Sequence, residues 1–401
     1  DLVLLDSAGH MGNVEFNYVI EQLKNECYLV LDDIYHIKHH KSFLQIKSDP
    51  RFELIVESKE KFGFCIAKYT PSLEKKSEKK VRNILWVRTD SIGDNILASS
   101  MLPYIREKYK HAIITVVCQK HIAELYEACP FVDEIIHYNK ELAYQDNQYT
   151  NNILQRLQDI HADIALNSVY SREPLTDAFT IGSKAKERIA FHGNLCNISN
   201  EIRDKHNQLY TKIVPSSSEH KPEIERHRDF LRGLGIDTPH LQPIVWITAE
   251  DEQFAEEYFC KNNLSSEKTI ALFAGAQGEI RFYRQYGTAI SKLCNDNHFT
   301  VIAFGTAPEY AINQQNLEEI DVRTINLSGK TTLRQTVALL KRCTLAVGAE
   351  TGTAHISCAV GTPNVILLGG GHFGRFMPYS PLTSVVCLPL ECYGCNWSCK
   401  Y

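Results

Sequence analysis

Residues 84–94 read Ile84-Leu85-Trp86-Val87-Arg88-Thr89-Asp90-Ser91-Ile92-Gly93-Asp94. A short apolar run passes directly into a polar turn that contains glycine, and the residues after it predict a helix that extends to about residue 108. A buried strand that leads straight into a helix is the repeating unit of a parallel α/β sheet. The stretch therefore predicts an α/β fold with a polar turn at the carboxyl end of a strand, where such sheets bind ligands.

The same alternation recurs along the rest of the chain. Strands are predicted at residues 113–117, 134–137 and 163–166, and again, after a Pro-containing hinge near residues 239–243, at 269–273, 300–304, 345–347 and 364–368. Helices are predicted between them. We therefore expect two Rossmann-like lobes that face each other across a cleft, at residues 82–240 and 241–401.

The first 70 residues show a shorter version of this pattern. Apolar runs and helical periods alternate from residue 2 to residue 69, as in part of an α/β sheet. The following segment is rich in Lys, Glu and Ser. We expect an additional partial α/β segment at residues 1–70 and a solvated linker at 71–81.

Composition limits the classes of protein that remain. Hydrophobic residues make up 44% and charged residues 23% of the 401 residues, the balance of a globular protein. The net charge of -5 gives no electrostatic support for nucleic-acid binding. No apolar run reaches the roughly 18–20 residues of a membrane span, so we expect a cytoplasmic protein. Because the sequence opens on Asp1 and an apolar run, we also expect it to be part of a longer chain.

Most of the 13 cysteines stand singly inside apolar segments, which predicts buried thiols in a reducing compartment. They include Cys27, Cys118, Cys294, Cys343 and Cys358.

The first candidate site is the turn that ends in Gly93 and Asp94. Glycine lets the backbone turn tightly, and a carboxylate in the first helical turn is favoured in its ionised form by the helix dipole. Such a group at the edge of a cleft can act as a general base. On spacing alone, Asp90 or Asp94 can equally be a helix cap.

The second candidate site is Glu350-Thr351-Gly352-Thr353-Ala354-His355, again between a strand and a helix. Backbone N–H groups at this helix start can hold a diphosphate, and Glu350 can accept hydrogen bonds from ribose hydroxyls. An ordinary capped helix with a packed His355 is the other interpretation. The third is the loop from Phe273 to Arg281, whose arginine can stabilise the charge on a departing nucleoside diphosphate. An ordinary surface arginine is the other interpretation.

Together these segments resemble glycosyltransferase family nine, the lipopolysaccharide heptosyltransferases. The resemblance includes the run from Ile84 to Asp94, then Pro130-Phe131-Val132-Asp133-Glu134-Ile135, then the Gly275 loop. It ends with Val347-Gly348-Ala349-Glu350-Thr351-Gly352 through His355 to Gly361-Thr362-Pro363. It extends from about residue 83 to the C-terminus.

The resemblance implies an inverting transferase with the glycosyltransferase-B fold that uses ADP-heptose and needs no catalytic metal. Asp94 would be the base that deprotonates the acceptor hydroxyl, with Ser91 and Gly93 beside it on the acceptor side. The donor-binding residues that it implies are Gly275, Ala276, Arg281, Glu350, Thr351, Gly352 and His355. The family usually has Asp where this chain has Glu350, and Lys followed by Trp-Pro where it has Arg281.

For partners, the resemblance implies ADP-heptose as donor and a lipopolysaccharide core or surface polysaccharide as acceptor. We expect no nucleic-acid partner and at most peripheral association with the inner face of the inner membrane, and we leave oligomerisation open. Two other functions remain open: a protein O-heptosyltransferase that modifies autotransporters, and a catalytically silent nucleotide-sugar-binding module. We expect acceptor contacts from loops at residues 138–157 and 171–194, and a contact between the donor and the glycine-rich loop 369–376 unless that loop is a plain connection.

Residues 1–70 resemble the second half of a class I S-adenosylmethionine methyltransferase, through Leu4-Leu5-Asp6-Ser7-Ala8-Gly9-His10 and Leu31-Asp32-Asp33-Ile34-Tyr35-His36. The glycine-rich loop that holds the cofactor in that family has no counterpart here. We therefore expect this fragment neither to bind S-adenosylmethionine nor to transfer a methyl group.

The C-terminal cluster reads Cys392-Tyr393-Gly394-Cys395-Asn396-Trp397-Ser398-Cys399. Two cysteines separated by two residues can bind one Zn or Fe, and Cys399 can join them. A fourth ligand would be Cys387 or would lie beyond Tyr401. A structural metal site and unpaired thiols are both consistent with this pattern, which is loosely similar to the iron-binding cysteine finger of some autotransporter-modifying heptosyltransferases.

Overall fold

The computed structural model describes all residues except 1, 7–10, 72–81, 217–220, 239 and 396–401. It divides the chain into two compact units, residues 1–80 and 81–401. Within the described residues, no helix has the length and hydrophobicity that crossing a membrane requires.

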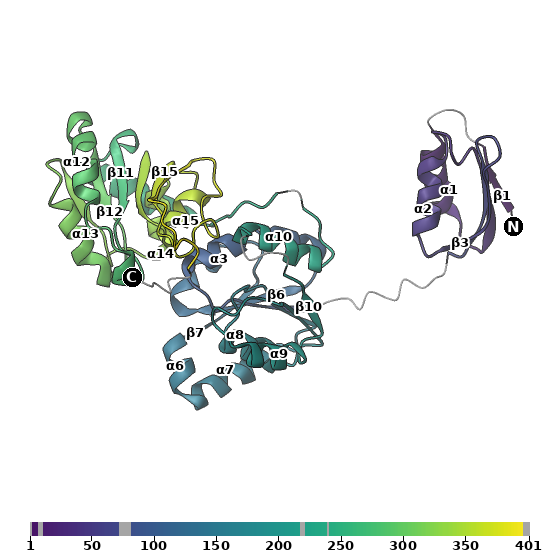
Figure 1. Ribbon diagram of the computed structural model, residues 1–401, viewed down its shortest axis with the longest axis horizontal. Coiled ribbons are helices and arrows are strands. Elements are labelled where there is room, and N and C mark those ends of the chain that lie inside the picture. Colours follow the sequence, from purple (N-terminus) through teal and green to yellow (C-terminus); the bar gives the residue numbers. More distant parts are fainter. Residues whose placement is uncertain (1, 7–10, 72–81, 217–220, 239, 396–401) are drawn as a thin grey trace. The chain divides into compact units, whose positions relative to one another are not determined.

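The first unit is a four-stranded sheet with two helices on one face (Figure 1). Its strands have the order β1-β2-β4-β3, and β4 runs antiparallel to both of its neighbours. Phe16 and Phe43 of the helices pack on Leu29 and Leu31 of β2, so the unit has a hydrophobic core of its own. The elements are β1 (Leu2–Leu5), α1 (Gly12–Gln22), β2 (Cys27–Asp32), α2 (His40–Ser48), β3 (Phe52–Ser58) and β4 (Phe64–Tyr69).

The second unit contains two six-stranded parallel sheets, which confirms the predicted α/β architecture. The sheet of the first lobe has the order β10-β9-β8-β5-β6-β7, with every pair parallel. Its strands are β5 (Asn83–Val87), β6 (Ile113–Gln119), β7 (Glu134–Tyr138), β8 (Ile164–Asn167), β9 (Glu187–Phe191) and β10 (Lys212–Val214). Residues Ile84 to Val87 are fully buried because helices cover both faces of this central strand.

Alternate residues of β5 face different layers of helices. Ile84 and Trp86 face the layer that contains α3 and α10, whereas Leu85 and Val87 face the layer that contains α7 and α8 (Figure 1). The helices of this lobe are α3 (Ile92–Ser99), α4 (Leu102–Lys108), α5 (Glu124–Glu127), α6 (Lys140–Gln145), α7 (Asn147–Asp159), α8 (Pro174–Gly182), α9 (Asn200–Asn207) and α10 (Glu223–Gly233).

Two predictions for this lobe are wrong in detail. The single helix expected up to residue 108 is split into α3 and α4, because Pro103 stands in the first turn of α4 and cannot continue a preceding helix. The segments 138–157 and 171–194, expected as loops, contain α6, α7, α8 and β9. The side chains of Asn139 and Asp146 cap α6 and α7 and so start these helices locally.

The sheet of the second lobe has the order β13-β12-β11-β14-β15-β16 and is also parallel throughout. Its strands are β11 (Thr269–Phe273), β12 (Thr300–Ala303), β13 (Thr324–Asn326), β14 (Leu345–Ala349), β15 (Asn364–Leu367) and β16 (Thr383–Val386). The helices are α11 (Ala249–Lys261), α12 (Tyr286–Asn297), α13 (Tyr310–Leu317), α14 (Leu333–Leu340) and α15 (Gly352–Ala359).

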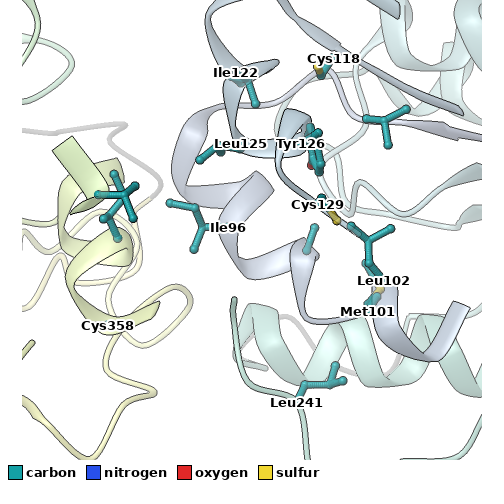
Figure 2. Close-up of a cluster of buried hydrophobic side chains, with 14 of the residues drawn as sticks. Ile96, Met101, Leu102, Cys118, Ile122, Leu125, Tyr126, Cys129, Leu241 and Cys358 are labelled. Carbon is teal, nitrogen blue, oxygen red and sulfur yellow. The ribbon is translucent and has the colours of Figure 1, made fainter. Parts of the chain in front are cut away.

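The two lobes share one continuous hydrophobic cluster, which includes Trp86 and Ile96 of the first lobe and Phe273 and Cys358 of the second. Helix α3 packs against α15, and Figure 2 shows Ile96 of α3 pointing toward the helix that carries Cys358. A polar contact adds to it: a carboxylate oxygen of Glu124 in α5 accepts a hydrogen bond of 2.8 Å from the backbone N–H of Leu333 in α14. The lobes therefore meet where α3 packs against α15 and where α5 contacts α14.

Candidate active site

The turn at residues 88–94 is stabilised by hydrogen bonds from a buried arginine. Arg88 is 1% exposed and donates to the carboxylate of Asp90, to the backbone carbonyl of Asp94 at 3.1 Å and to the hydroxyl of Ser168 at 2.9 Å. Ser91 Oγ donates to Asp94 Oδ2 at 2.6 Å. The Asp94 carboxylate is thus fixed in a half-buried position at the start of α3.

Asp90 belongs to the interior of the first lobe. Burial raises the pKa of its carboxyl to about 7, although the neighbouring Arg88 cation lowers it. Its Oδ1 accepts from the side-chain Nδ2 of Asn95 at 3.0 Å, and the side-chain Oδ1 of Asn95 accepts from the hydroxyl of Tyr126 at 2.6 Å. Both carboxylate oxygens of Asp90 therefore accept from buried side chains of the first lobe, so Asp90 supports the turn and Asp94 is the candidate base.

Glu350 follows β14 at the carboxyl edge of the other sheet. Burial raises the pKa of this carboxyl to about 7, while Arg281 lowers it and Asp94 raises it. Thr351 is the N-cap residue of α15, but its side chain makes no capping hydrogen bond. The start of α15 thus lies within electrostatic reach of Asp94 and offers backbone N–H groups that the Thr351 side chain does not occupy.

Two glycines let the lobes approach closely beside Asp94. A Cβ placed on Gly93 would lie 2.6 Å from Cδ2 of His355, and one on Gly352 would lie 2.9 Å from Cγ2 of Ile92. Side chains larger than hydrogen at either position would therefore push α3 and α15 apart.

His355 is the residue against which Gly93 packs. Burial lowers the pKa of its imidazole to about 4, so the ring is neutral near pH 7. The ring stacks on Tyr379 with centroids 5.7 Å apart, and Nδ1 lies 3.1 Å from the tyrosine hydroxyl. His355 is thus a rigid part of the wall between the lobes.

Arg281 lies next to the Glu350 turn. It ends a short 3-10 helix (Glu279–Arg281), and its guanidinium donates to the backbone carbonyl of Glu350. Both residues border a pocket of about 490 Å³. Apolar side chains of Phe282, Leu368 and Leu388 line other parts of that pocket. A fixed cation therefore stands between the start of α15 and this pocket.

Gly275 and Ala276 lie in the same loop as Arg281, and Gly275 packs against Glu309 of the same lobe. A Cβ on Gly275 would lie 2.4 Å from Oε1 of Glu309, whose other oxygen accepts from the N–H and hydroxyl of Thr306. Ala276 is 8% exposed. The glycine is required here by the neighbouring capping box of Glu309.

The five cysteines named as buried thiols are buried, whereas Cys196 and Cys260 are exposed. Cys27, Cys118, Cys294, Cys343 and Cys358 are buried free thiols, as expected. Cys392 and Cys395 are half-buried and free, and Cys399 lies outside the described residues. Within the described ranges, no three His, Cys, Asp or Glu side chains form a group that could hold a metal.

The structure therefore brings Asp94, Arg281, Glu350, Gly352 and His355 together where the two lobes meet. Arg88 was part of the predicted turn but had no predicted role, because nothing in the spacing of the sequence shows that its side chain bonds the backbone of Asp94. The signal available in the sequence was a cationic residue directly after an apolar run that predicts a buried strand.

Comparison with known proteins identifies the kind of protein. The family model for glycosyltransferase family 9 (heptosyltransferase) matches residues 198–399. The lipopolysaccharide core heptosyltransferase OpsX of Haemophilus influenzae is 22% identical over 311 residues, which cover 76% of this chain and 84% of that protein. Lipopolysaccharide heptosyltransferase 2 of Salmonella typhimurium is 23% identical over a match that covers 71% of this chain and 82% of that protein.

Solved structures share the fold. The family 9 glycosyltransferase of Veillonella parvula superposes with a TM-score of 0.67 at 18% identity, over 77% of this chain and 86% of that one. The ADP-heptose lipopolysaccharide heptosyltransferase II of E. coli superposes with a TM-score of 0.60 at 20% identity, over 76% of this chain and 90% of that one. With the family model covering half of the sequence, this chain is a glycosyltransferase that belongs to glycosyltransferase family 9.

Proposed function

We propose that this chain transfers a heptose-type sugar from ADP-heptose to a lipopolysaccharide core or a related surface glycan, with inversion at the anomeric carbon. The observation that carries this proposal is the position of Asp94. It lies at the start of α3, where Gly93 packs against His355 and Ile92 packs against Gly352 of α15. Arg281 donates to the backbone carbonyl of Glu350, which directly precedes α15. The heptosyltransferase names of the relatives support the choice of sugar.

The proposed reaction is a single displacement. The acceptor hydroxyl gives its proton to Asp94 while its oxygen forms a bond to the anomeric carbon of the donor. The bond between that carbon and the phosphate oxygen breaks, and ADP leaves with the electron pair. Arg281 and the backbone N–H groups at the start of α15 stabilise the charge that develops on the diphosphate, so the proposed step needs no metal ion.

The roles of the remaining donor-side residues follow from their positions. Glu350 accepts from ribose hydroxyls, and Thr351 and Gly352 leave the helix start accessible to phosphate. His355 holds the lobes in register rather than touching the proton that moves, because its imidazole is buried and bonded to Tyr379. The family resemblance implies a cytoplasmic reaction with at most peripheral contact to the inner membrane.

The test is turnover of ADP-heptose by the wild type and by Asp94→Asn. Asparagine keeps the size of the side chain and can accept from Ser91, but it cannot take the acceptor proton. We expect kcat to fall by roughly 10²–10⁴-fold with little change in the Kd of ADP, as for removal of a general base. Asp204→Asn is the control, because Asp204 is an exposed carboxylate of α9.

Three outcomes are informative. Unchanged turnover by Asp94→Asn would rule out Asp94 as the base. Binding of ADP-heptose without turnover by the wild type would favour a silent binding module. Turnover of another nucleotide sugar in a calorimetric and kinetic panel would replace the donor but keep the mechanism.

We propose further that residues 1–70 correspond to part of a methyltransferase-like domain that does not bind its cofactor. Its four-stranded α/β sheet and the motifs at residues 4–6 and 31–36 support this, while residues 7–10 lie outside the described structure. Calorimetric titration of the full chain with S-adenosylmethionine should show no binding. A micromolar Kd would contradict the proposal.

A further inference from the structure

A glycine-rich loop at residues 369–376 leads away from β15 at the carboxyl edge of the second sheet. Gly374 has a φ of +76°, in the left-handed region that favours glycine. The sequence left two roles open for this loop, contact with the donor and a plain connection. The structure shows a third arrangement, in which the loop reaches the first lobe.

Arg375 makes the contact with the first lobe. Its Nε donates to Oε2 of Glu223 at 2.9 Å, and its Nη2 donates to the hydroxyl of Ser171 at 2.8 Å. The backbone N–H of Glu223 in turn donates to the carbonyl oxygen of Arg375 at 2.7 Å. Glu223 begins α10, so one residue of the second lobe bonds both the main chain and the side chain of that helix start.

This contact is protected from water. The side chains of Arg375 and Glu223 are 13% and 6% exposed. The guanidinium of Arg375 lies over the rings of Phe376 and Tyr170, at 4.6 Å and 5.6 Å from their centroids. Arg226, one turn along α10, also lies over the Tyr170 ring, 3.5 Å from its centroid, and its Nε is 3.6 Å from Oε2 of Glu223. Removing one member of a buried ion pair leaves the other charge uncompensated and is strongly destabilising, so the loss of Arg375 should disturb this contact.

Arg375 belongs to a loop that starts at the candidate active site, since Gly369 and Gly370 border the same pocket as Arg281 and Glu350. Its cation lowers the pKa of Glu350, and the Asp94 carboxylate raises the pKa of Arg375. The same loop carries His372, whose pKa burial lowers to about 4, with further lowering by Arg375 and Arg281. The loop therefore runs from the pocket of Arg281 and Glu350 to the contact of Arg375 with the first lobe.

We propose that Arg375 is a positioning residue for the transfer reaction: by bonding Glu223 and Ser171 it docks loop 369–376 on the first lobe and so fixes Asp94 against the donor side. This inference rests on the proposed function for its catalytic consequence. A direct contact with the donor diphosphate is the competing role. The structure favours positioning, because Nε and Nη2 of Arg375 already donate to acceptors of the first lobe.

The experiment uses the full chain with Arg375→Gln, Arg375→Lys, Glu223→Gln and the double variant Arg375→Gln/Glu223→Gln. Arg232→Gln is the matched control. Arg232 lies on α10, the helix of Glu223, but it is half exposed, and in the described structure its ion pairs are with Asp229 and Asp237. Steady-state kinetics with ADP-heptose are combined with hydrogen exchange of backbone amides in the substrate-free protein.

For a positioning residue we expect kcat to fall about 10–100-fold in Arg375→Gln while the KM for the donor changes less than about threefold, since a misaligned pair of reacting groups slows chemistry rather than binding. Glu223→Gln should give a similar loss, and the double variant should lose little more than either single variant. Arg375→Lys should recover part of kcat. Exchange should accelerate at residues 222–226 and 369–377 in Arg375→Gln and stay unchanged in Arg232→Gln.

Other results would overturn the proposal. A rise in donor KM with unchanged kcat would make Arg375 a donor contact, and additive losses in the double variant would show that it does not act through Glu223. Unchanged exchange at residues 222–226 and 369–377 would show that it does not dock the loop. If the wild type does not turn over ADP-heptose, the proposed donor fails, but the exchange measurement still tests the docking, and the kinetics are then repeated with the donor that the panel identifies.

Discussion

Replacing Gly93 by alanine tests the close approach of the lobes beside Asp94. A Cβ at this position would lie 2.6 Å from Cδ2 and 3.2 Å from Nε2 of His355. The imidazole cannot retreat easily, because it is buried, stacked on Tyr379 and bonded to the tyrosine hydroxyl. The new methyl group must therefore be accommodated by moving α3 away from α15, which moves Asp94 away from Glu350.

The magnitude follows from the cost of overpacking. Inserting a methyl group into a well-packed contact costs about 1–3 kcal/mol. If that cost opposes the aligned arrangement of the lobes, kcat/KM should fall roughly 5- to 150-fold. The melting temperature should change little, because alanine is favoured over glycine in a helix by about 1 kcal/mol and offsets part of the cost.

The assay is kcat/KM with ADP-heptose together with thermal unfolding. Gly182→Ala is the matched control: its Cβ would also meet a neighbour at 2.6 Å, but that neighbour is the end of Leu154 within the first lobe. We expect Gly182→Ala to keep nearly normal activity. Normal activity in Gly93→Ala as well would refute the role assigned to the contact between α3 and α15.

Three more predictions concern charge and metal. Burial raises the pKa of Glu350 from 4.5 to about 7, so the folded protein keeps a proton that the unfolded chain releases, and stability falls as pH rises through this window. Glu350→Gln should remove that loss. At about 1.4 kcal/mol per pKa unit, the free energy of unfolding of the variant should exceed that of the wild type by up to about 3 kcal/mol at pH 8 and should not exceed it at pH 4. Urea denaturation at both pH values measures this difference. Arg281→Gln should weaken ADP binding roughly 10- to 100-fold in calorimetry, the value of a charge-assisted hydrogen bond, while the exposed neighbour Arg284→Gln should not. If Cys392, Cys395 and Cys399 hold a metal, elemental analysis should find Zn or Fe in the wild type and less in Cys392→Ser; equal metal content would count against that site.

The parts of the fold that the sequence predicted are those where local pattern and burial coincide. Ile84 to Val87 and Ala346 to Ala349 are apolar, buried and followed by glycine turns, so both strand-to-helix units at the site were predicted correctly. Helix α7 was missed because most of its residues are polar, although Tyr149, Ile153, Leu157 and Ile160 form an apolar stripe at helical spacing that packs on the core. Its start depends on a single capping aspartate.

The missing part of the site could not be predicted for a different reason. Arg375 and Glu223 are 152 positions apart, and neither residue type is unusual in its surroundings. Their pairing depends on how the two six-stranded sheets meet, which no local pattern encodes. Arg88 was visible as a charge after a buried strand, but its bonds to Asp90 and to the carbonyl of Asp94 required the backbone of the turn.

The hydrophobic cluster that spans both lobes has a consequence for how the protein melts. Because Trp86 and Phe273 belong to one continuous interior, neither sheet can lose its packing without exposing apolar surface of the other. Residues 1–80 have a separate interior around Phe16 and Leu29. Differential scanning calorimetry should therefore record two endotherms rather than three, with the larger one belonging to both six-stranded sheets together.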